Sequence, residues 1–316
     1  FTYQYDTQGR LTTDGYATYT YNANNNLNTV TGNGYTITYG YDNIQRINSV
    51  QTAYPLGFTK TVTYQYDLAN RITRITYPGG LYVDYIYDNA NRLTEVRWNG
   101  ASNPPTAKYF YRNDGLTSRV ELGNGTKTYY AYDAAGRMVK LANIKAAGDT
   151  ITAYDFTLDP NGNHLIEAAK EQYASYPAMG AANISYAYNT DNSIATSTNN
   201  VFSFDNNGNC VSRTGRTYTY DSKDNILTGS NSTAYTYDAL ENRRTKTTGG
   251  ITNAFVLDAL NTSNVLIETD ASGNALWYYL YGQGMVARVN AATSAISYYH
   301  HDYRGSTAAI TDSSKN

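Results

Sequence analysis

The sequence predicts an all-β protein: a continuous antiparallel strip of β-hairpins that coils into a spiral shell or a barrel-like wall. Three observations predict it. The motif Tyr-x-Tyr-Asp recurs, and an arginine followed by an aliphatic residue comes four residues after the aspartate. Turn-forming Asn, Asp and Gly residues cluster directly after the aspartates. The repeat continues along most of the 316 residues, and repeat units bury their apolar faces only by stacking on neighbours.

Five copies of the motif are complete. They consist of Tyr3, Tyr5, Asp6 and Arg10; Tyr39, Tyr41, Asp42 and Arg46; Tyr64, Tyr66, Asp67 and Arg71; Tyr85, Tyr87, Asp88 and Arg92; and Tyr130, Tyr132, Asp133, Gly136 and Arg137. Degenerate copies lie at 19–22, 109–111, 156–159, 186–189, 202–205, 218–221, 235–238 and 255–258. Successive copies are separated by 16 to 30 residues. This irregular spacing favours hairpins with loops of different lengths over the regular coils of a solenoid.

Each part of the motif has a place in a hairpin. Residues two apart in a strand share a face, so Tyr-x-Tyr puts two rings on one side. The aspartate ends the strand, and a residue such as Gly136 supplies the positive φ of a type I turn with a bulge. The arginine starts the return strand, and the next, aliphatic residue faces the core. We expect the Asp and Arg to pair across the turn, where an exposed pair contributes about 0–1 kcal/mol and serves to fix the turn.

The number of copies sets the size of the strip. About 26 strands at roughly 4.8 Å per strand extend on the order of 125 Å along the hydrogen-bonding direction. Strand twist makes a strip of that length curl. Wrapped once, it forms a ring whose two terminal strands expose unpaired backbone groups. We therefore expect a single turn with a narrow lumen.

Composition excludes several classes of protein. Charged residues make up 16% of the chain, the net charge is -2 and the sequence shows no basic patch, so we do not expect nucleic acid as a partner. Apolar stretches such as 265–267 are far too short for insertion into a membrane. Cys210 is the single cysteine, which excludes an internal disulfide framework and a cysteine-rich metal site. The abundance of Tyr, Asn, Thr, Ser and Gly favours a secreted or cell-surface protein.

A second motif lies near the C-terminal end. It consists of Tyr298, Tyr299, His300, His301 and Asp302, followed by Gly305 and Ser306. With the Tyr-Asp repeats, this run resembles the Rhs or YD-repeat family, which includes Rhs toxins, wall-associated toxins, shell subunits of insecticidal toxin complexes and teneurins. Tyr303 and Arg304 stand where the family usually has an aliphatic residue. The resemblance covers essentially the whole chain.

The resemblance implies an organisation and a function. Residues 1–275 correspond to the YD-repeat hairpin array, and 276–316 to the incomplete start of the Rhs-associated core region. Family strips coil into hollow shells that enclose a C-terminal toxin, which implies a structural, encapsulating segment without enzymatic activity. The expected partners are the protein's own C-terminal effector or neighbouring repeats. The chain begins inside a repeat and has no cap, so we expect it to be part of a longer protein.

Few residues suggest chemistry. In a strand His300 and Asp302 share a face, as a catalytic or metal-binding pair would require. Three histidines and one cysteine supply no further ligands, so packing or hydrogen bonding is favoured for His300 and His301, and no cofactor or metal is expected. The segments 159–163 and 205–209 resemble calcium loops but lack the closing glutamate, which favours hairpin turns. Asp159-Pro160 lies in such a turn, so the family's autoproteolysis is not carried over to it.

Two other functions remain open. The strip also fits an extracellular adhesin or fibre, in which identical subunits stack and contact cells. A third reading is a glycan-binding module that uses surface tyrosines and Trp98, with a cell-surface glycan or protein as its partner. Tyrosines at period two favour cross-strand packing over ligand stacking. The Ala-rich segment 170–179 interrupts the repeat, and we expect a short helix or loop there.

Overall fold

The computed structural model describes residues 2–100, 104–171 and 184–314, and these residues form β-strands and their connections with no helix. Paired strands are antiparallel, and strands adjacent in the sheets are also adjacent in sequence. The predicted all-β antiparallel strip is therefore confirmed. None of the described residues forms a helix able to cross a membrane. Of the predicted insertion at 170–179, Lys170 and Glu171 end a strand, and the remainder lies outside the described residues.

The strip divides into three hydrogen-bonded sheets. The first contains β1 (Gln4–Tyr5), β2 (Leu11–Thr13), β3 (Thr18–Tyr21), β4 (Leu27–Gly32), β5 (Tyr35–Tyr41), β6 (Ile47–Ala53), β7 (Thr59–Tyr66), β8 (Ile72–Thr76), β9 (Tyr82–Tyr87), β10 (Leu93–Trp98), β11 (Ala107–Tyr111), β12 (Thr117–Leu122), β13 (Lys127–Tyr132), β14 (Met138–Ile144), β15 (Thr150–Leu158) and β16 (His164–Glu171). The second contains β17 (Tyr186–Tyr188), β18 (Ile194–Ser197), β19 (Asn200–Phe204), β20 (Cys210–Arg213) and β21 (Arg216–Thr217). The third contains β22 (Thr219–Tyr220), β23 (Ile226–Gly229), β24 (Thr233–Tyr237), β25 (Arg243–Thr248), β26 (Ile251–Asp258), β27 (Asn261–Thr269), β28 (Ala275–Gly282), β29 (Gly284–Asn290), β30 (Ile296–His301) and β31 (Thr307–Thr311).

The hairpin between β7 and β8 represents the repeat. Tyr66 pairs with Ile72, with a bulge next to Tyr66. The backbone N–H of Asp67 donates to the carbonyl of Arg71 at 3.0 Å, which closes the turn. Asn70 takes the left-handed conformation with φ of 62°, and Gly136 takes it with φ of 77° in the equivalent turn. The bulged turn with a positive-φ residue is thus present as the sequence indicates.

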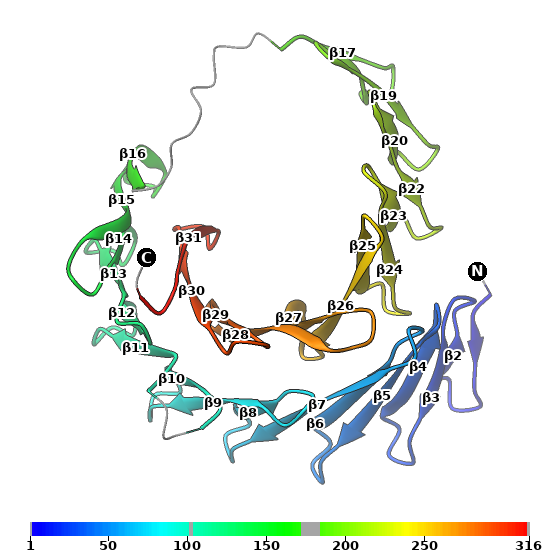
Figure 1. Cartoon of the computed structure of the whole chain (residues 1–316), viewed down its shortest axis with the longest axis horizontal. Coiled ribbons are helices and arrows are strands. Elements are labelled where there is room, and N and C mark those ends of the chain that lie inside the picture. Colours follow the sequence, from blue (N-terminus) through cyan, green and yellow to red (C-terminus); the bar gives the residue numbers. More distant parts are fainter. Residues whose placement is uncertain (1, 101–103, 172–183, 315–316) are drawn as a thin grey trace.

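The strip coils into an open spiral that passes itself. Strands β24–β31 follow the inner side of β4–β15, so the wall is two layers thick along that arc (Figure 1). The expectation of a single ring is therefore wrong. The physical reason is that Tyr-x-Tyr makes one face of the strip apolar, and a second layer removes that face from water.

The main hydrophobic core lies between the two turns of the spiral. The outer turn contributes Ile37, Val62 and Val96, and the inner turn contributes Leu266 and Leu280, all of them buried. Burying a side chain of this size contributes about 1.5–3 kcal/mol. Packing between the turns is therefore a major source of stability for the double-layered arc.

At β1 and β17, where the wall is one layer thick (Figure 1), the motif tyrosines are exposed. Tyr64 on the double-layered arc is 3% exposed, whereas Tyr186 and Tyr188 on β17 are 52% and 61% exposed. Tyr3 and Tyr5 beside β2 are also 59% and 60% exposed. The repeat therefore forms the hairpin in both the one-layered and the two-layered parts of the wall. The tyrosines are buried where the inner turn of the spiral covers them.

Candidate functional site

The aspartate of each complete repeat organises its own turn. In the Asp67 turn, Oδ1 accepts hydrogen bonds from the backbone N–H groups of Ala69 at 2.9 Å and Arg71 at 3.0 Å. Oδ2 accepts from Nε of Arg71 at 2.6 Å. The hydrogen bond from the Arg71 backbone is the largest of the effects that lower the pKa of Asp67. The other complete copies have the same arrangement, at Asp6 and Arg10, Asp42 and Arg46, Asp88 and Arg92, and Asp133 and Arg137.

The second tyrosine of many repeats ties its hairpin to the preceding one. The hydroxyl of Tyr87 donates to the carbonyl of Ile72 at 3.0 Å, and the guanidinium of Arg71 lies 4.7 Å from the centre of the Tyr87 ring. We call this pair of contacts the staple. The same hydroxyl-to-carbonyl bond is made by Tyr21, Tyr41, Tyr66, Tyr111, Tyr132, Tyr220, Tyr237 and Tyr281.

The staple links successive hairpins in addition to the backbone hydrogen bonds between their strands. Nη1 of Arg71 also donates to Oδ1 of Asn91 in the next turn at 2.9 Å. One arginine thus contacts its own aspartate, the next ring and the next turn. A cation close to an aromatic ring contributes about 0.5–1 kcal/mol at exposed sites. The predicted Asp and Arg positions are therefore brought together, and each Arg also reaches a neighbouring repeat, which the sequence did not indicate.

The first tyrosine of the motif points toward the inner turn. The hydroxyl of Tyr64 donates to Oδ1 of Asp258 at 2.9 Å and accepts from the N–H of Ala259 at 2.8 Å. Burial raises the pKa of Tyr130 to about 12. Tyr39, Tyr85 and Tyr130 pack against the same core without full burial. The two tyrosines of one motif therefore have different partners, the preceding hairpin and the inner turn.

Other tyrosines hold the outer and inner turns of the spiral together, and the sequence motif did not identify them. The hydroxyls of Tyr54 and Tyr77 donate to the backbone carbonyls of Phe255 at 2.8 Å and Tyr279 at 2.7 Å. Tyr35 is hydrogen bonded to Thr236 at 2.7 Å. One signal in the sequence does mark two of them: Tyr54 and Tyr77 each precede a proline and start a turn that a glycine closes. These turns lie at the edge opposite the Tyr-Asp turns.

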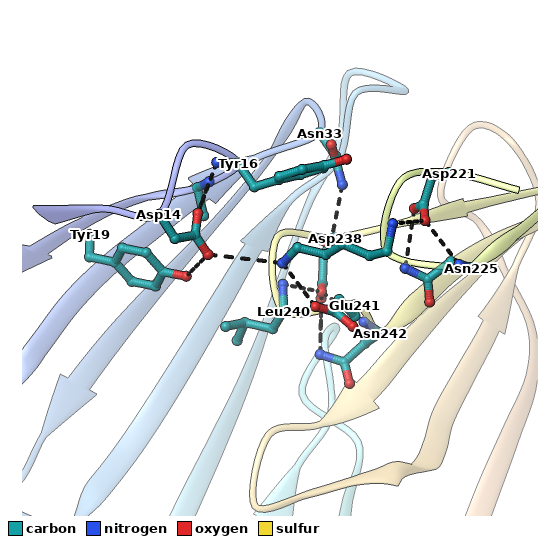
Figure 2. Close-up of polar contacts among 12 residues, drawn as sticks. Asp14, Tyr16, Tyr19, Asn33, Asp221, Asn225, Asp238, Leu240, Glu241 and Asn242 are labelled. Atoms are coloured by element: carbon teal, nitrogen blue, oxygen red, sulfur yellow. Dashed lines mark hydrogen bonds and ion pairs between the residues drawn. The ribbon is translucent and has the colours of Figure 1, made fainter. Parts of the chain in front are cut away.

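A polar clasp joins the beginning of the strip to the place where the inner turn meets it. Figure 2 shows Asp14, Tyr19 and Asn33 facing the turn that contains Asp238 and Glu241. Nζ of Lys223 lies 2.8 Å from Glu241 and 3.9 Å from Asp14, and 4.9 Å from the ring centre of Tyr16. The hydrogen bond with Glu241 is the main reason that the pKa of Lys223 is raised. Asp14, Tyr16, Lys223 and Glu241 form the clasp.

The C-terminal motif is structural in its contacts. His300 is buried, with Nε2 2.9 Å from the hydroxyl of Thr311, and burial lowers its pKa to about 4. Nε2 of His301 lies 2.6 Å from the carbonyl oxygen of Met285. Asp302 accepts from the backbone N–H groups of Arg304 and Ser306, both at 2.8 Å, in a turn of the repeat type. His300 and Asp302 therefore have separate partners and form no pair.

The remaining motif positions complete the same hairpin. Tyr298 is buried in the main core, and Tyr299 lies on the strand between it and His300. Gly305 has φ of 82°, as the turn requires. His164 begins β16, with its ring centre 4.5 Å from that of Phe156. Among the described residues, no three His, Cys, Asp or Glu side chains gather as metal ligands.

These observations define a class of protein: a spiral wall of stapled β-hairpins. The sequence matches the teneurin YD-shell family over residues 41–143 and 127–316. The chain belongs to this family, as the repeat and the C-terminal motif indicated. Strands β28–β31 continue the sheet of β22–β27, and the boundary placed between residues 275 and 276 stays a prediction.

Curated relatives are bacterial proteins. The chain is 27% identical over 176 residues to the tRNA nuclease WapA of Bacillus subtilis strain 168, a match that covers 54% of this chain and 7% of that protein. It is 30% identical over 136 residues to the tRNA(Glu)-specific nuclease WapA of Bacillus subtilis subsp. natto, covering 41% of this chain and 6% of the relative. The chain thus matches a small part of these proteins.

Solved structures with the same fold come from toxin complexes. The Photorhabdus luminescens Tc holotoxin pore aligns with 100% of this chain and 22% of its own, with a TM-score of 0.69 and 11% identity. The TcdB2-TccC3 crystal structure aligns with 100% of this chain and 23% of its own, with a TM-score of 0.68 and 12% identity. At this identity the likeness establishes a shared fold.

Proposed function

We propose that the chain is a wall segment of a toxin shell that surrounds an effector carried by the same polypeptide. The observation that carries the proposal is the nested spiral, in which the inner turn of the spiral covers the tyrosines of the outer turn along only part of the wall (Figure 1). Tyr186 and Tyr188 keep the repeat geometry, since Tyr188 pairs with Ile194 as Tyr66 pairs with Ile72, yet both are exposed. Exposed aromatic side chains mark a surface that is available for contact with other material, which the proposal assigns to the enclosed effector.

The relatives support this division of labour. The nuclease activity in the name of WapA belongs to a protein of which this chain matches about 7%. The titratable groups of the repeat, such as Asp67 and Arg71, are engaged in turn closure and stapling. We therefore propose that the segment itself is not an enzyme and that it serves to enclose or present the effector. Secretion or display at the cell surface is part of the same proposal.

Electron microscopy of the native protein tests the proposal. The expected result is discrete hollow particles, with density for the effector inside the wall. Helical or fibrillar order, with subunits repeating along an axis, would overturn encapsulation and support the adhesin or fibre. Limited proteolysis adds a second readout, because an enclosed effector is expected to resist cleavage while the shell is intact and to be degraded once the shell is unfolded.

A further inference from the structure

The hairpin that begins at Asp258 has no arginine beside its stapled ring, Tyr281. Burial without a countercharge sets it apart from the other turns that have Asn or Ser four residues after the aspartate, at Asp205, Asp221, Asp238, Asp270 and Asp302. In the Asp67 turn, the strand partners Tyr66 and Ile72 are separated by five residues, and Arg71 directly precedes Ile72. In the Asp258 hairpin Leu257 pairs with Val265 and Asp258 itself pairs with Asn261, so residues 262–264 form a bulge in β27. Asn264 then occupies the position of the arginine, and Thr262 is the residue four after the aspartate.

The two groups that such an arginine would contact are both present. Asp258 corresponds to the aspartate that pairs with arginine in the complete repeats. Tyr281 corresponds to the stapled ring, because its hydroxyl donates to the carbonyl of Val265 at 3.1 Å. Among the residues that the structure describes, no cation lies over the Tyr281 ring and none pairs with Asp258. The contacts of a repeat arginine are therefore left without their cation.

Burial makes this absence significant. Asp258 is 6% exposed, and its hydrogen bonds come from neutral donors, the hydroxyl of Tyr64 at 2.9 Å and the N–H of Leu260 at 3.0 Å. The other deeply buried aspartate of the repeat, Asp238, has Nε of Arg244 at 2.7 Å. Burial raises the pKa of Asp258, as expected for a carboxylate without a countercharge.

A pocket lies at this position. It has a volume of about 220 Å³ and is open to solvent, and its lining includes Asp258, Asn264 and Tyr281 from the inner turn and Tyr85 and Tyr87 from the outer turn. The hydroxyl of Tyr85 makes no hydrogen bond within the described part of the chain. The pocket thus combines a buried carboxyl group, an amide oxygen and aromatic rings, which are the groups that bind an organic cation.

We propose that this pocket binds a guanidinium group, in the position that the repeat arginine occupies elsewhere in the spiral. The guanidinium would donate to the Asp258 carboxylate and lie against the Tyr281 ring. Its source is either a small free guanidinium compound or an arginine side chain of a polypeptide. The proposal depends on the repeat geometry and holds whether or not the wall encloses an effector.

Calorimetric titration with methylguanidinium chloride tests the proposal, with sodium chloride at equal ionic strength as the blank. Saturable one-to-one binding near pH 7.5 is expected, with weaker binding as the carboxyl group becomes protonated at lower pH. Asp258→Asn should weaken binding at least tenfold, because it keeps the shape and loses the charge. Asp302→Asn, in an exposed turn of the ordinary repeat type, is the control for loss of an aspartate and should bind as the unaltered protein does.

A second variant keeps the test decisive if Asp258→Asn fails to fold. Asn264→Arg supplies the missing side chain from within, so it should abolish methylguanidinium binding and raise the melting temperature. The peptide acetyl-Gly-Arg-Gly-amide separates the two sources: tighter binding than methylguanidinium assigns the site to a polypeptide, and equal or weaker binding assigns it to a free compound. Absence of saturable binding by both probes to the unaltered protein would overturn the proposal.

Discussion

The hydroxyl of Tyr66 donates to the backbone carbonyl of Ile47 at 2.7 Å, which joins one hairpin to the first residue of the return strand of the hairpin before it. The guanidinium of Arg46 lies 4.5 Å from the centre of the same ring. Arg46 also pairs with Asp42 at 2.6 Å. The residues that define the repeat in sequence are therefore those that couple successive repeats in space.

Removing one staple hydroxyl should weaken this coupling. Tyr66→Phe leaves the Ile47 carbonyl without its side-chain donor, and we expect the free energy of unfolding to fall by about 0.5–1.5 kcal/mol. Tyr188→Phe is the matched control, because Tyr188 is exposed and its hydroxyl makes no hydrogen bond among the described residues. Urea denaturation followed by circular dichroism measures both. Equal losses in the two variants would contradict the staple.

The turn glycine should tolerate asparagine and reject valine. Gly136 has φ of 77°, and Asn70 and Asn91 take the same conformation in sister turns with φ of 62° and 64°. Gly136→Val should therefore cost about 1 kcal/mol or more through backbone strain. Gly136→Asn should cost much less, since Asn enters the left-handed region readily. The same denaturation experiment compares them, and a harmless valine would refute the bulged-turn assignment.

Gly282 lies where the two turns of the spiral approach each other closely. A Cβ at Gly282 would lie 2.0 Å from the Tyr109 hydroxyl oxygen, whereas one at Gly229 would meet nothing closer than 4.0 Å. Overpacking of this kind typically costs about 1–3 kcal/mol, so Gly282→Ala should lower the melting temperature and Gly229→Ala should not. Adding Tyr109→Phe to Gly282→Ala should restore part of the loss, because it removes the nearest atom. Calorimetry of the three variants decides the point.

The clasp should contribute more than an ordinary surface ion pair. Lys223 contacts Glu241, Asp14 and the ring of Tyr16 at once, whereas Lys140 pairs with Asp155 at 2.8 Å in a well-exposed setting. We expect Lys223→Met to destabilise the protein by roughly 1 kcal/mol and Lys140→Met by a few tenths at most. The difference should shrink at high salt. A Lys223 effect no larger than that of Lys140 would show that the clasp is dispensable.

Buried His300 predicts a dependence of stability on pH. Its pKa is lowered from 6.5 to about 4 in the folded protein, so the unfolded chain binds the proton more readily. Its contribution should be fully present above pH 6.5, fall as the pH drops toward 4, and reach a loss on the order of 3 kcal/mol. His300→Gln should flatten this part of the profile. Denaturation midpoints measured between pH 8 and 4 test it, and parallel profiles for the two proteins would contradict it.

The hairpins were predictable because their determinants are local. Tyr64, Tyr66, Asp67 and Arg71 lie within eight residues, and their spacing specifies strand, turn and return strand. The inner turn of the spiral was not predictable in the same way. Tyr54 and Tyr77 donate to main-chain carbonyls of the inner turn, and a carbonyl has no signature in a sequence. The estimate of one ring assumed that strip length alone sets the curvature.

The candidate site was only partly predictable for a related reason. Complete motifs are recognised by the residues they contain, whereas the Asp258 pocket arises from a residue that is missing. The sequence shows that Thr262 stands four residues after Asp258, where complete repeats have arginine. The bulge in β27 that places Asn264 directly before the strand partner Val265 appears only in the strand register. Burial of Asp258 depends in turn on Tyr64, which is 194 positions away.

The distance in sequence between the two turns has a consequence for biosynthesis. Tyr77 finds its acceptor 202 residues later in the chain, and Tyr54 finds its own 201 residues later. At about 5–20 residues per second, a ribosome needs about 10–40 s to deliver those partners. During that interval the nascent outer turn carries an aromatic face with no cover. Nascent chains on one polysome can therefore associate through these exposed faces. We expect chaperone occupancy to be highest while the middle of the chain is being translated.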